Sequence, residues 1–398
     1  MKYDIRLNGT TIFKKMLQRV YAVSAAPATQ VKPLNTYPAN HLAQRMYPHT
    51  QHLIIKKIIT HSRDCKTFVF APDVQKGTNE IAWFSAGQYL VIHAVIDDRT
   101  YKRPYYITSA PQDSLNGEIS VCIKRVDGGI VSGNALDSWQ EGDSITTSPP
   151  LGNFTYEPLR DARTIIGIAD DIGIAPFLSL AGAVRDGDED CKLTLLYSAC
   201  NRDAVLTEQF ETIAKTSADV KLIKVFGDEE QSGCEHGSVT AQLIQKYAPK
   251  DENYSLFTCG QKAFLNAIDP EIKKLGLLRK FIRTEQCSEI IHPNNVGDDA
   301  QSPLKIYQLK VIMSEKERLI DAPAEISLLR AMENAGINPP SACRTGKCGW
   351  CHSQLISGNV YIPKESDDRR MADKEFGYIH PCCSFPLSDI VLNVPKGD

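Results

Sequence analysis

Short apolar runs separated by turn residues cover 51–157, and their spacing predicts β-strands. Six such runs follow one another at near-regular intervals, at 53–59, 66–72, 88–96, 103–109, 118–126 and 144–150. Many short, evenly spaced strands are typical of a small antiparallel β-barrel. One exception, 132–140, opens on a serine and predicts a short helix.

From 158 to 288 the pattern changes to apolar strand-like runs that alternate with helix-like segments. The first pair is 163–169 followed by 174–186, with Pro176 near the helix start, a position that proline tolerates. A later helix is expected to be interrupted at Pro270. Strand–helix alternation predicts an α/β domain with a doubly wound parallel sheet.

The rest of the chain predicts one further domain and two connecting segments. Residues 1–50 have weak periodicity and indicate an N-terminal extension, whereas 289–303 is rich in Pro, Asn, Asp and Gly, as linkers are. Residues 304–398 contain a strand-like run, a helix ending at Gly336, a cysteine-rich loop and a closing strand. The length of 398 residues suits this multidomain organisation.

Charge and composition exclude several classes of partner. The 45 Lys and Arg against 48 Asp and Glu leave a net charge of −3, which excludes nucleic acid or an anionic membrane as the main partner. The most apolar stretch, 164–184, carries Asp170 and Asp171 at its centre, so no membrane span is expected. No apolar run of signal-peptide length occurs in 1–26, and seven of the 12 cysteines are scattered singly. These features predict a cytoplasmic protein.

Five cysteines gather near the C-terminus. Cys343, Cys348 and Cys351 form a C-x4-C-x2-C motif, and Cys382 and Cys383 follow about thirty residues later. This is the plant-type [2Fe–2S] spacing, in which one tight loop supplies three thiolates and a distant segment the fourth. Glycines at 346 and 349 let such a loop close around the sulfur atoms. Zinc is the weaker alternative, because structural zinc sites usually combine two C-x2-C pairs. Spacing alone does not separate Cys382 from Cys383.

The whole segment 304–398 resembles a plant-type ferredoxin, which has a β-grasp α+β fold. The resemblance includes the helix before the loop, SGNV at 357–360 and PCCSFPLSDIVL at 381–392. Matched to the last cysteine of that family, the fourth ligand falls on Cys382. The resemblance therefore implies that Cys343, Cys348, Cys351 and Cys382 bind the cluster.

A second group of residues offers partners for a flavin. Arg103-Pro104-Tyr105-Tyr106 ends a predicted strand and presents an arginine for a phosphate and a tyrosine for a flat ring. Taken alone, it also fits an edge strand whose aromatic rings pack inside the barrel. Downstream, Gly128-Gly129-Ile130-Val131-Ser132 opens a helix whose free N–H groups suit a pyrophosphate.

Together these motifs resemble the ferredoxin–NADP⁺ reductase family, in the oxygenase-reductase branch that carries a fused ferredoxin, over about 52–390. The resemblance implies a FAD-binding barrel, with Arg103 on the diphosphate and Tyr105 against the isoalloxazine. Ser132 and the backbone of Gly129 complete the phosphate site, and Pro104, Gly128 and Val131 belong to the same motifs. Tyr106 stands where the family usually has Ser or Thr.

In the α/β domain the resemblance implies a nucleotide site at Gly173 and Pro176. Asp170 and Asp171 precede them, where two carboxylates oppose a diphosphate; the alternative is that an aspartate caps the helix and occupies its own anion site. Cys259 corresponds to the position near the nicotinamide, although it equally fits a small core residue. Glu285 lies in a segment similar to the family's closing one. Asp203 and the acidic stretch at 227–230 favour NADH over NADPH.

These cofactors predict a converter between two-electron and one-electron carriers. The expected enzyme is an NAD(P)H-dependent oxidoreductase in which Tyr105, Cys259 and Glu285 serve catalysis. It passes electrons through FAD and the [2Fe–2S] cluster to a protein acceptor such as an oxygenase, a hydroxylase or another redox protein. The alternative is an electron-transfer subunit with a degenerate nucleotide site that relays electrons between redox proteins. A zinc or flavin-sensing module without redox chemistry is a remote third possibility.

Overall fold

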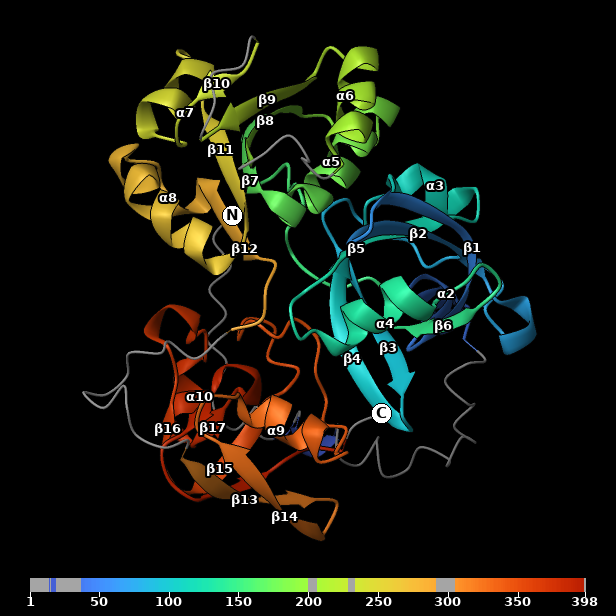
Figure 1. The fold of residues 1–398 in the computed structure, drawn as a ribbon, viewed down its shortest axis with the longest axis vertical. Helices are drawn as coiled ribbons and strands as arrows, with labels where there is room; N and C mark the ends of the chain where they lie inside the picture. Colours follow the sequence, from blue (N-terminus) through green and yellow to red (C-terminus); the bar gives the residue numbers. More distant parts are fainter. Residues whose placement is uncertain are drawn as a thin grey trace. The chain divides into compact units, whose positions relative to one another are not determined.

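The computed structural model describes residues 14, 16–18, 37–199, 206–227, 233–290 and 305–396. It divides into a unit of residues 1–46 and a unit of residues 47–398. In the first unit, helix α2 spans Pro38–Met46. The elements described below belong to the second unit, in which three sheets of five or six strands follow one another along the chain (Figure 1). A fourth sheet consists of the two strands β16 (Val360–Tyr361) and β18 (Phe385–Pro386).

The first sheet has six strands in the order β4-β3-β6-β1-β2-β5, and every strand pair in it is antiparallel. Its elements are β1 (Gln51–Ser62), β2 (Cys65–Pro72), β3 (Tyr89–Ile96), β4 (Arg99–Tyr106), α3 (Pro111–Leu115), β5 (Ile119–Lys124), α4 (Ile130–Ser138) and β6 (Ser144–Thr147). A bridge between Ile107, which follows β4, and Val121 of β5 connects the two edges of the sheet, as in a closed barrel. The barrel core contains Leu53, Phe70 and Ile92, all almost completely buried.

Helix α4 begins at Ile130, two residues before the predicted start at Ser132. Gly129 has extended backbone angles and is the N-cap, so the helix can start directly after the glycine pair. Ser132 therefore lies in the first turn, where its hydroxyl bonds to the preceding loop.

The second sheet is wholly parallel, in the order β10-β9-β8-β7-β11-β12. Its elements are β7 (Thr164–Asp170), α5 (Ala175–Asp186), β8 (Lys192–Ala199), α6 (Thr207–Thr216), β9 (Val220–Phe226), β10 (Glu235–His236), α7 (Ala241–Tyr247), β11 (Tyr254–Gly260), α8 (Lys262–Lys274) and β12 (Ile282–Gln286). Pro270 lies inside α8, which continues through it instead of being interrupted.

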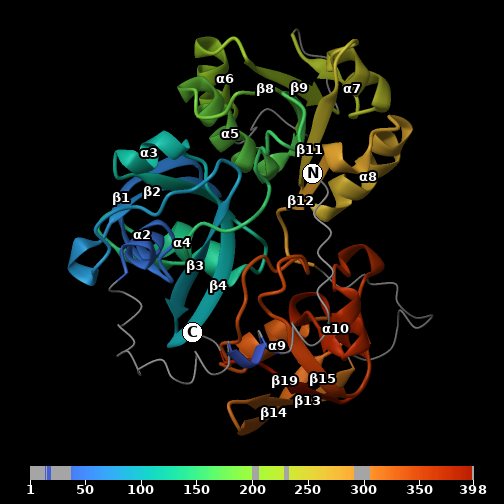
Figure 2. The ribbon, with the colours of Figure 1, turned by 180° about the vertical axis from the view of Figure 1, so that it is seen from behind.

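Helices cover both faces of this sheet, as doubly wound folds require. Helices α5 and α6 cover one face, and α7 and α8 cover the other (Figure 2). Phe177 of α5 and Phe210 of α6 belong to one core cluster, and Ile244 of α7 and Leu265 of α8 belong to another. The chain runs from β7 outward to β8 and β9, then returns to place β11 on the opposite side of β7. The crevice between the carboxyl ends of β7 and β11 is therefore the topological switch point, where such sheets bind ligands.

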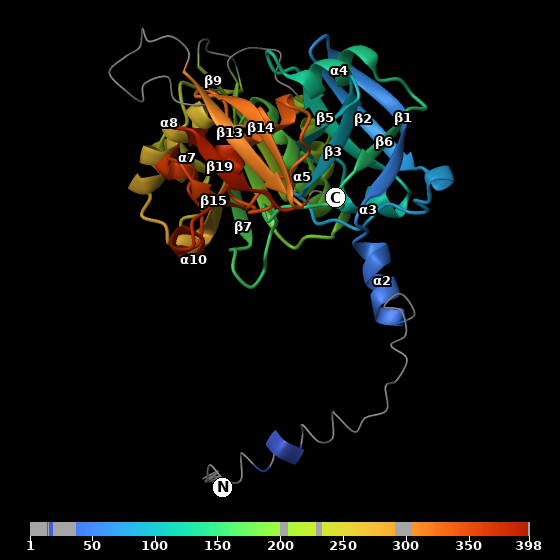
Figure 3. The ribbon, with the colours of Figure 1, turned by 90° about the horizontal axis from the view of Figure 1, so that it is seen from below.

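The third sheet has the order β14-β13-β19-β15-β17, with β13 and β19 parallel and the other pairs antiparallel (Figure 3). The elements of this domain are β13 (Ile306–Met313), β14 (Lys316–Pro323), α9 (Leu328–Asn334), β15 (Ser353–Ser357), β16 (Val360–Tyr361), α10 (Met371–Glu375), β17 (Tyr378–Ile379), β18 (Phe385–Pro386) and β19 (Ile390–Asn393). Helix α9 contributes Leu328 and Met332 to the core. The described part of the chain contains no helix with the length and apolar character needed to cross a membrane.

Candidate functional site

The C-x4-C-x2-C loop lies between α9 and β15, and its backbone points N–H groups at cysteine sulfur. The N–H groups of Thr345 and Cys348 donate to Cys343 Sγ at 3.4 and 3.3 Å, and Cys343 N–H donates to Cys348 Sγ at 3.5 Å. Cys382 comes from a short 3-10 turn (Pro381–Cys383) far along the chain and is buried. The distant segment thus meets the loop, as the spacing predicts.

The thiols interact in two pairs, Cys343 with Cys348 and Cys351 with Cys382. The bond from Cys348 lowers the pKa of Cys343 to about 6. The bond from Cys351 likewise holds the pKa of Cys382 well below its ordinary value. In each pair the hydrogen bond lowers the pKa of one thiol and raises that of the other. Two pairs of cysteines match a centre in which each of two irons takes two cysteines. Among the described residues, no three His, Cys, Asp or Glu side chains gather around a single metal position.

The backbone of the cysteine loop packs closely against the segments at 366 and 383, and one glycine permits this approach. Gly346 has φ +82°, and a Cβ built on it would lie 2.4 Å from the carbonyl oxygen of Ser366 and 3.0 Å from Cys383 Sγ. The neighbouring Thr345 Oγ1 is buried and finds no hydrogen-bond partner within the described residues. Two pairs of cysteine sulfurs, N–H groups that point at sulfur and an unpartnered hydroxyl together fit a [2Fe–2S] cluster.

The predicted flavin strand is β4, where Arg103 carries the densest set of contacts. Its Nη1 donates to the carbonyl oxygen of Lys102 at 2.8 Å and to Glu333 Oε1 at 3.1 Å, and its Nε lies 2.9 Å from Glu289 Oε1. No hydrogen bond from Arg103 Nη2 is found among the described residues, so the N–H groups of Nη2 can donate to a further anion. Tyr105 packs beside Val131 of α4, and burial raises the pKa of its hydroxyl, which therefore stays neutral.

The glycine pair before α4 packs closely against the first turn of the helix. Gly128 has φ +66°, and a Cβ on Gly129 would lie 2.5 Å from Ser132 Oγ. Ser132 Oγ accepts from the N–H of Val126 at 3.1 Å and lies 3.3 Å from the carbonyl oxygen of Gly129. No side chain caps the helix, so its first N–H groups are available to an anion. The donor set of this loop and of Arg103 fits a flavin diphosphate.

The nucleotide turn follows β7 at the switch point. A Cβ on Gly173 would lie 2.3 Å from the carbonyl oxygen of Cys259, so only glycine lets this turn approach β11. Pro176 is buried in the first turn of α5. Gly173 and Pro176 thus both lie at the crevice where the sequence predicted a nucleotide site. The contact that Gly173 makes there is packing between the ends of β7 and β11.

The two aspartates of this turn fill the crevice themselves. Asp170 Oδ1 accepts a hydrogen bond from the backbone N–H of Gln261, at the start of α8, at 3.0 Å. Burial raises the pKa of Asp170 to about 6. Asp171 has φ +42° and pairs with Lys124 Nζ of β5 at 2.5 Å. Asp170 therefore occupies an anion position, but at the start of α8 and not at its own helix α5.

Three residues predicted from the sequence lie near the end of β12: Tyr106, Cys259 and Glu285. Glu285 interacts electrostatically with Tyr106 of β4 and lies 3.8 Å from Lys347 Nζ of the cysteine loop. Burial raises the pKa of the Glu285 carboxyl, against the opposing effect of Lys347. Cys259 is completely buried in the domain core, and burial raises the pKa of its thiol well above the ordinary value. Its side chain thus has the surroundings of a core residue.

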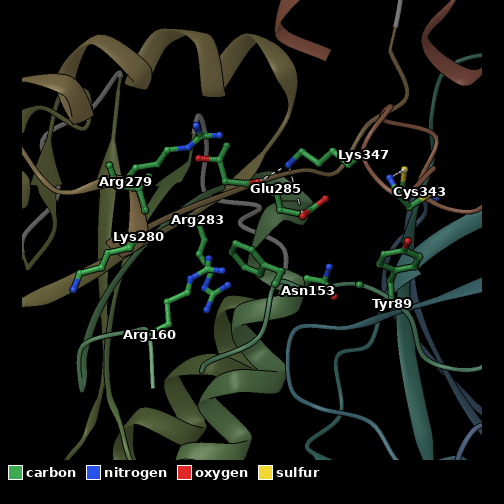
Figure 4. A pocket seen from close by; sticks show the side chains of 14 residues that line it. Tyr89, Asn153, Arg160, Arg279, Lys280, Arg283, Glu285, Cys343 and Lys347 are labelled. Carbon is green, nitrogen blue, oxygen red and sulfur yellow. Dashed lines mark hydrogen bonds and ion pairs between the residues drawn. The ribbon is translucent and has the colours of Figure 1, made fainter. Parts of the chain in front are cut away.

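A cavity of about 640 Å³ opens beside this meeting point (Figure 4). Its lining includes Tyr89 of β3, Arg160, Arg279, Lys280, Glu285, and Lys347 with Cys343 and Cys348. None of these basic lining residues was assigned to a site from the sequence. The only sequence feature that could have indicated them is the adjacent basic pair Arg279-Lys280. Asp203 and residues 228–230, on which the NADH preference rested, lie outside the described residues.

Comparison with known proteins gives three family matches in the predicted order. Residues 52–156 match the oxidoreductase FAD-binding domain, 168–269 the oxidoreductase NAD-binding domain, and 311–387 the 2Fe-2S iron-sulfur cluster binding domain. One subunit of the 1,2-phenylacetyl-CoA epoxidase from Escherichia coli is 27% identical over 86% of this chain and 96% of its own length. The glycine betaine monooxygenase reductase subunit of Chromohalobacter salexigens is 23% identical over 84% and 93%.

Solved structures agree on the fold. Phthalate dioxygenase reductase, described as a modular structure for electron transfer from pyridine nucleotides to [2Fe-2S], has a TM-score of 0.62 at 20% identity and covers 87% of this chain and 98% of its own. An intact type IV self-sufficient cytochrome P450 monooxygenase gives a TM-score of 0.55 over 95% of this chain and 44% of its own. With three matching domains in one polypeptide, the chain is an NAD(P)H-dependent iron–sulfur flavoprotein of the ferredoxin–NADP⁺ reductase family with a C-terminal [2Fe–2S] domain.

Proposed function

We propose that this chain is the reductase component of an oxygenase system and that it takes electrons from NADH in preference to NADPH. Several relatives that cover most of its length are named as components of an epoxidase and of monooxygenases, and another is named an NADH oxidoreductase. We further propose a cytoplasmic location, in keeping with the free cysteines of the described chain. The domain limits proposed are 51–157 for the flavin barrel, 158–288 for the nucleotide domain and 304–398 for the ferredoxin domain.

One observation carries the proposal: side chains from all three domains meet at Glu285. Tyr106 comes from the flavin strand, Glu285 from the nucleotide domain and Lys347 from the cysteine loop. Lys347 Nζ also donates to the carbonyl oxygen of Thr284 at 2.5 Å. A second contact is apolar, where Tyr89 and Val91 of β3 pack against Ala342 and Cys343. Both contacts bring the barrel and the cluster loop together, as electron transfer within one chain requires.

Bound FAD would supply a two-electron hydride acceptor, and a [2Fe–2S] cluster would supply a one-electron carrier. The chain's own residues position these groups. Arg103 and the first N–H groups of α4 would bind the diphosphate, Tyr105 would lie against the flat ring, and the cysteines 343, 348, 351 and 382 would hold the cluster. Tyr106 and Glu285 interact electrostatically where nicotinamide and flavin would meet. The raised pKa of Glu285 lets its carboxyl hold a proton there.

The fit of a nucleotide at the switch point is incomplete, because Asp170 already accepts the N–H of Gln261. This contact favours a second candidate, in which NADH binds weakly and a redox protein is the main electron donor. In either case the electrons leave through the ferredoxin domain.

Anaerobic titration of the holoprotein with NADH and with NADPH, followed by absorbance and electron paramagnetic resonance, tests the proposal. We expect NADH to reduce both the flavin and the cluster, and NADPH to do so at least about tenfold more slowly. Reduction by neither nucleotide would overturn the first candidate and favour the second. The NADH-reduced protein should then support turnover of an oxygenase component, with oxygen uptake as the readout.

A further inference from the structure

Four charged side chains form a closed ion cluster between the flavin barrel and the ferredoxin domain. Glu333 Oε1 accepts from Arg103 Nη1 at 3.1 Å and from Arg344 Nη1 at 2.8 Å. Glu289 Oε1 lies 2.9 Å from Arg103 Nε and 2.5 Å from Arg344 Nε. Two carboxylates thus bridge two guanidinium groups, and the four charges cancel.

Each member comes from a different functional segment. Arg103 belongs to the flavin strand β4, and Glu289 follows β12 of the nucleotide domain. Glu333 lies in the last turn of α9. Arg344 directly follows the cluster cysteine Cys343 and has φ +60°, a left-handed conformation that a non-glycine residue adopts only when its surroundings hold it. The same carboxylate of Glu333 therefore contacts the flavin strand and the cluster loop.

Burial makes Glu333 the central member of the ion cluster. The side chains of Glu333 and Arg344 are 4% and 2% exposed, whereas that of Glu289 is 33% exposed. Removing one partner of a buried pair leaves an uncompensated charge, which costs much more than losing an exposed pair. The next residue is held as well, because the backbone carbonyl oxygen of Asn334 accepts a hydrogen bond from Arg99 Nη1 of β4 at 3.0 Å. The end of α9 is thus tied to both ends of β4.

We propose that Glu333 is a positioning residue that docks the ferredoxin domain on β4 and thereby sets the rate at which electrons pass from the flavin to the cluster. The proposal deepens the proposed function and rests on it for the direction of flow. Glu333 makes no contact with the cysteine sulfurs, and its bonds to Arg103 use only Nη1. Its loss should loosen the contact between the two domains and leave donors on Arg103 for the flavin.

The test is Glu333→Gln in the full-length holoprotein, mixed rapidly with NADH without oxygen. We expect flavin reduction within about twofold of the wild type and cluster reduction slower by at least about tenfold. Amide hydrogen exchange supplies a readout independent of activity, and 99–106 and 328–334 should exchange faster in the variant. The matched control is Glu325→Gln, an exposed carboxylate of the same domain, which should leave both rates and the exchange unchanged.

Arg99→Ala keeps the test decisive if Glu333→Gln does not fold. Arg99 is exposed and its substitution removes only the bond to Asn334 O, so a smaller slowing of cluster reduction is expected, on the order of threefold. Wild-type rates and exchange in both variants would overturn the proposal. Equal slowing of flavin and cluster reduction would also overturn it, since Glu333 would then act on the flavin site. If NADH fails to reduce even the wild-type flavin, the proposed function fails, while the exchange experiment still decides the docking role.

Discussion

The carboxylate of Asp170 accepts a hydrogen bond from the backbone N–H of Gln261, 3.0 Å away, across the crevice between β7 and β11. These residues end one strand and begin the helix after the other, so the bond spans the topological switch point of the sheet. A nucleotide diphosphate needs N–H groups at this place. The chain thus supplies its own anion where the cofactor's anion would approach.

Asp170→Asn should strengthen NADH binding. Asparagine has the same shape and can still accept from Gln261 N–H, but it removes a negative charge that opposes the diphosphate. We expect the dissociation constant of NADH to fall about tenfold, equivalent to about 1.4 kcal/mol. Isothermal titration of the oxidised protein measures it, with the exposed Asp251→Asn as the control. An unchanged constant would mean that the nucleotide binds away from Asp170.

The wild-type affinity for NADH should also depend on pH. Burial raises the pKa of Asp170 to about 6, so the carboxyl is neutral below this pH and charged above it. Because the charged form repels the diphosphate, affinity should fall as pH rises through about 6. Titrations between about pH 5 and pH 8 test this. In Asp170→Asn the curve should be flat over that range, and a wild-type slope retained in the variant would assign the dependence to another group.

The sequence allowed the three-domain fold to be predicted because each domain has a strong local pattern. Period-two runs, strand–helix alternation and the C-x4-C-x2-C motif each depend on neighbouring residues. The start of α4 was placed two residues late because Ser132 imitates an N-cap, whereas Gly129 takes that position. Pro270 was expected to interrupt α8, and the helix continues through it.

The ion cluster around Arg103 could not be predicted in the same way. Arg103 and Glu333 are 230 residues apart and lie in different domains, so no spacing rule connects them. The contact of Asp170 with Gln261, 91 residues apart, is equally non-local. The sequence identified the unusual aspartates, but the only alternative to nucleotide binding that it suggested was a cap on their own helix, since local capping is the contact that a sequence can show.

Gly346→Ala should reduce the iron content of the protein. The new Cβ would lie 2.4 Å from the carbonyl oxygen of Ser366, and alanine at φ +82° costs about 1–2 kcal/mol in addition. We expect at least about half of the bound iron and labile sulfide to be lost, measured by chemical analysis. Gly377→Ala is the control, because its φ is +74° but the nearest atom to its Cβ is 3.5 Å away. Equal losses in both variants would show that backbone conformation alone, and not the space at Gly346, decides cluster binding.

Separate substitution of Cys382 and Cys383 tests which of these neighbouring cysteines is the fourth ligand. Cys382 interacts with Cys351, and this bond holds its pKa well below the ordinary value. Cys383 Sγ instead donates to the carbonyl oxygen of His380 at 3.3 Å, and the bond with Cys382 raises its pKa. A cluster ligand must be a thiolate, so Cys382→Ser should abolish the [2Fe–2S] absorbance and resonance signal, while Cys383→Ser should retain both. The flavin content of the two variants should stay equal, which separates loss of the cluster from loss of the fold. The opposite result would assign the ligand to Cys383 and would require the turn at 381–383 to rotate by one residue.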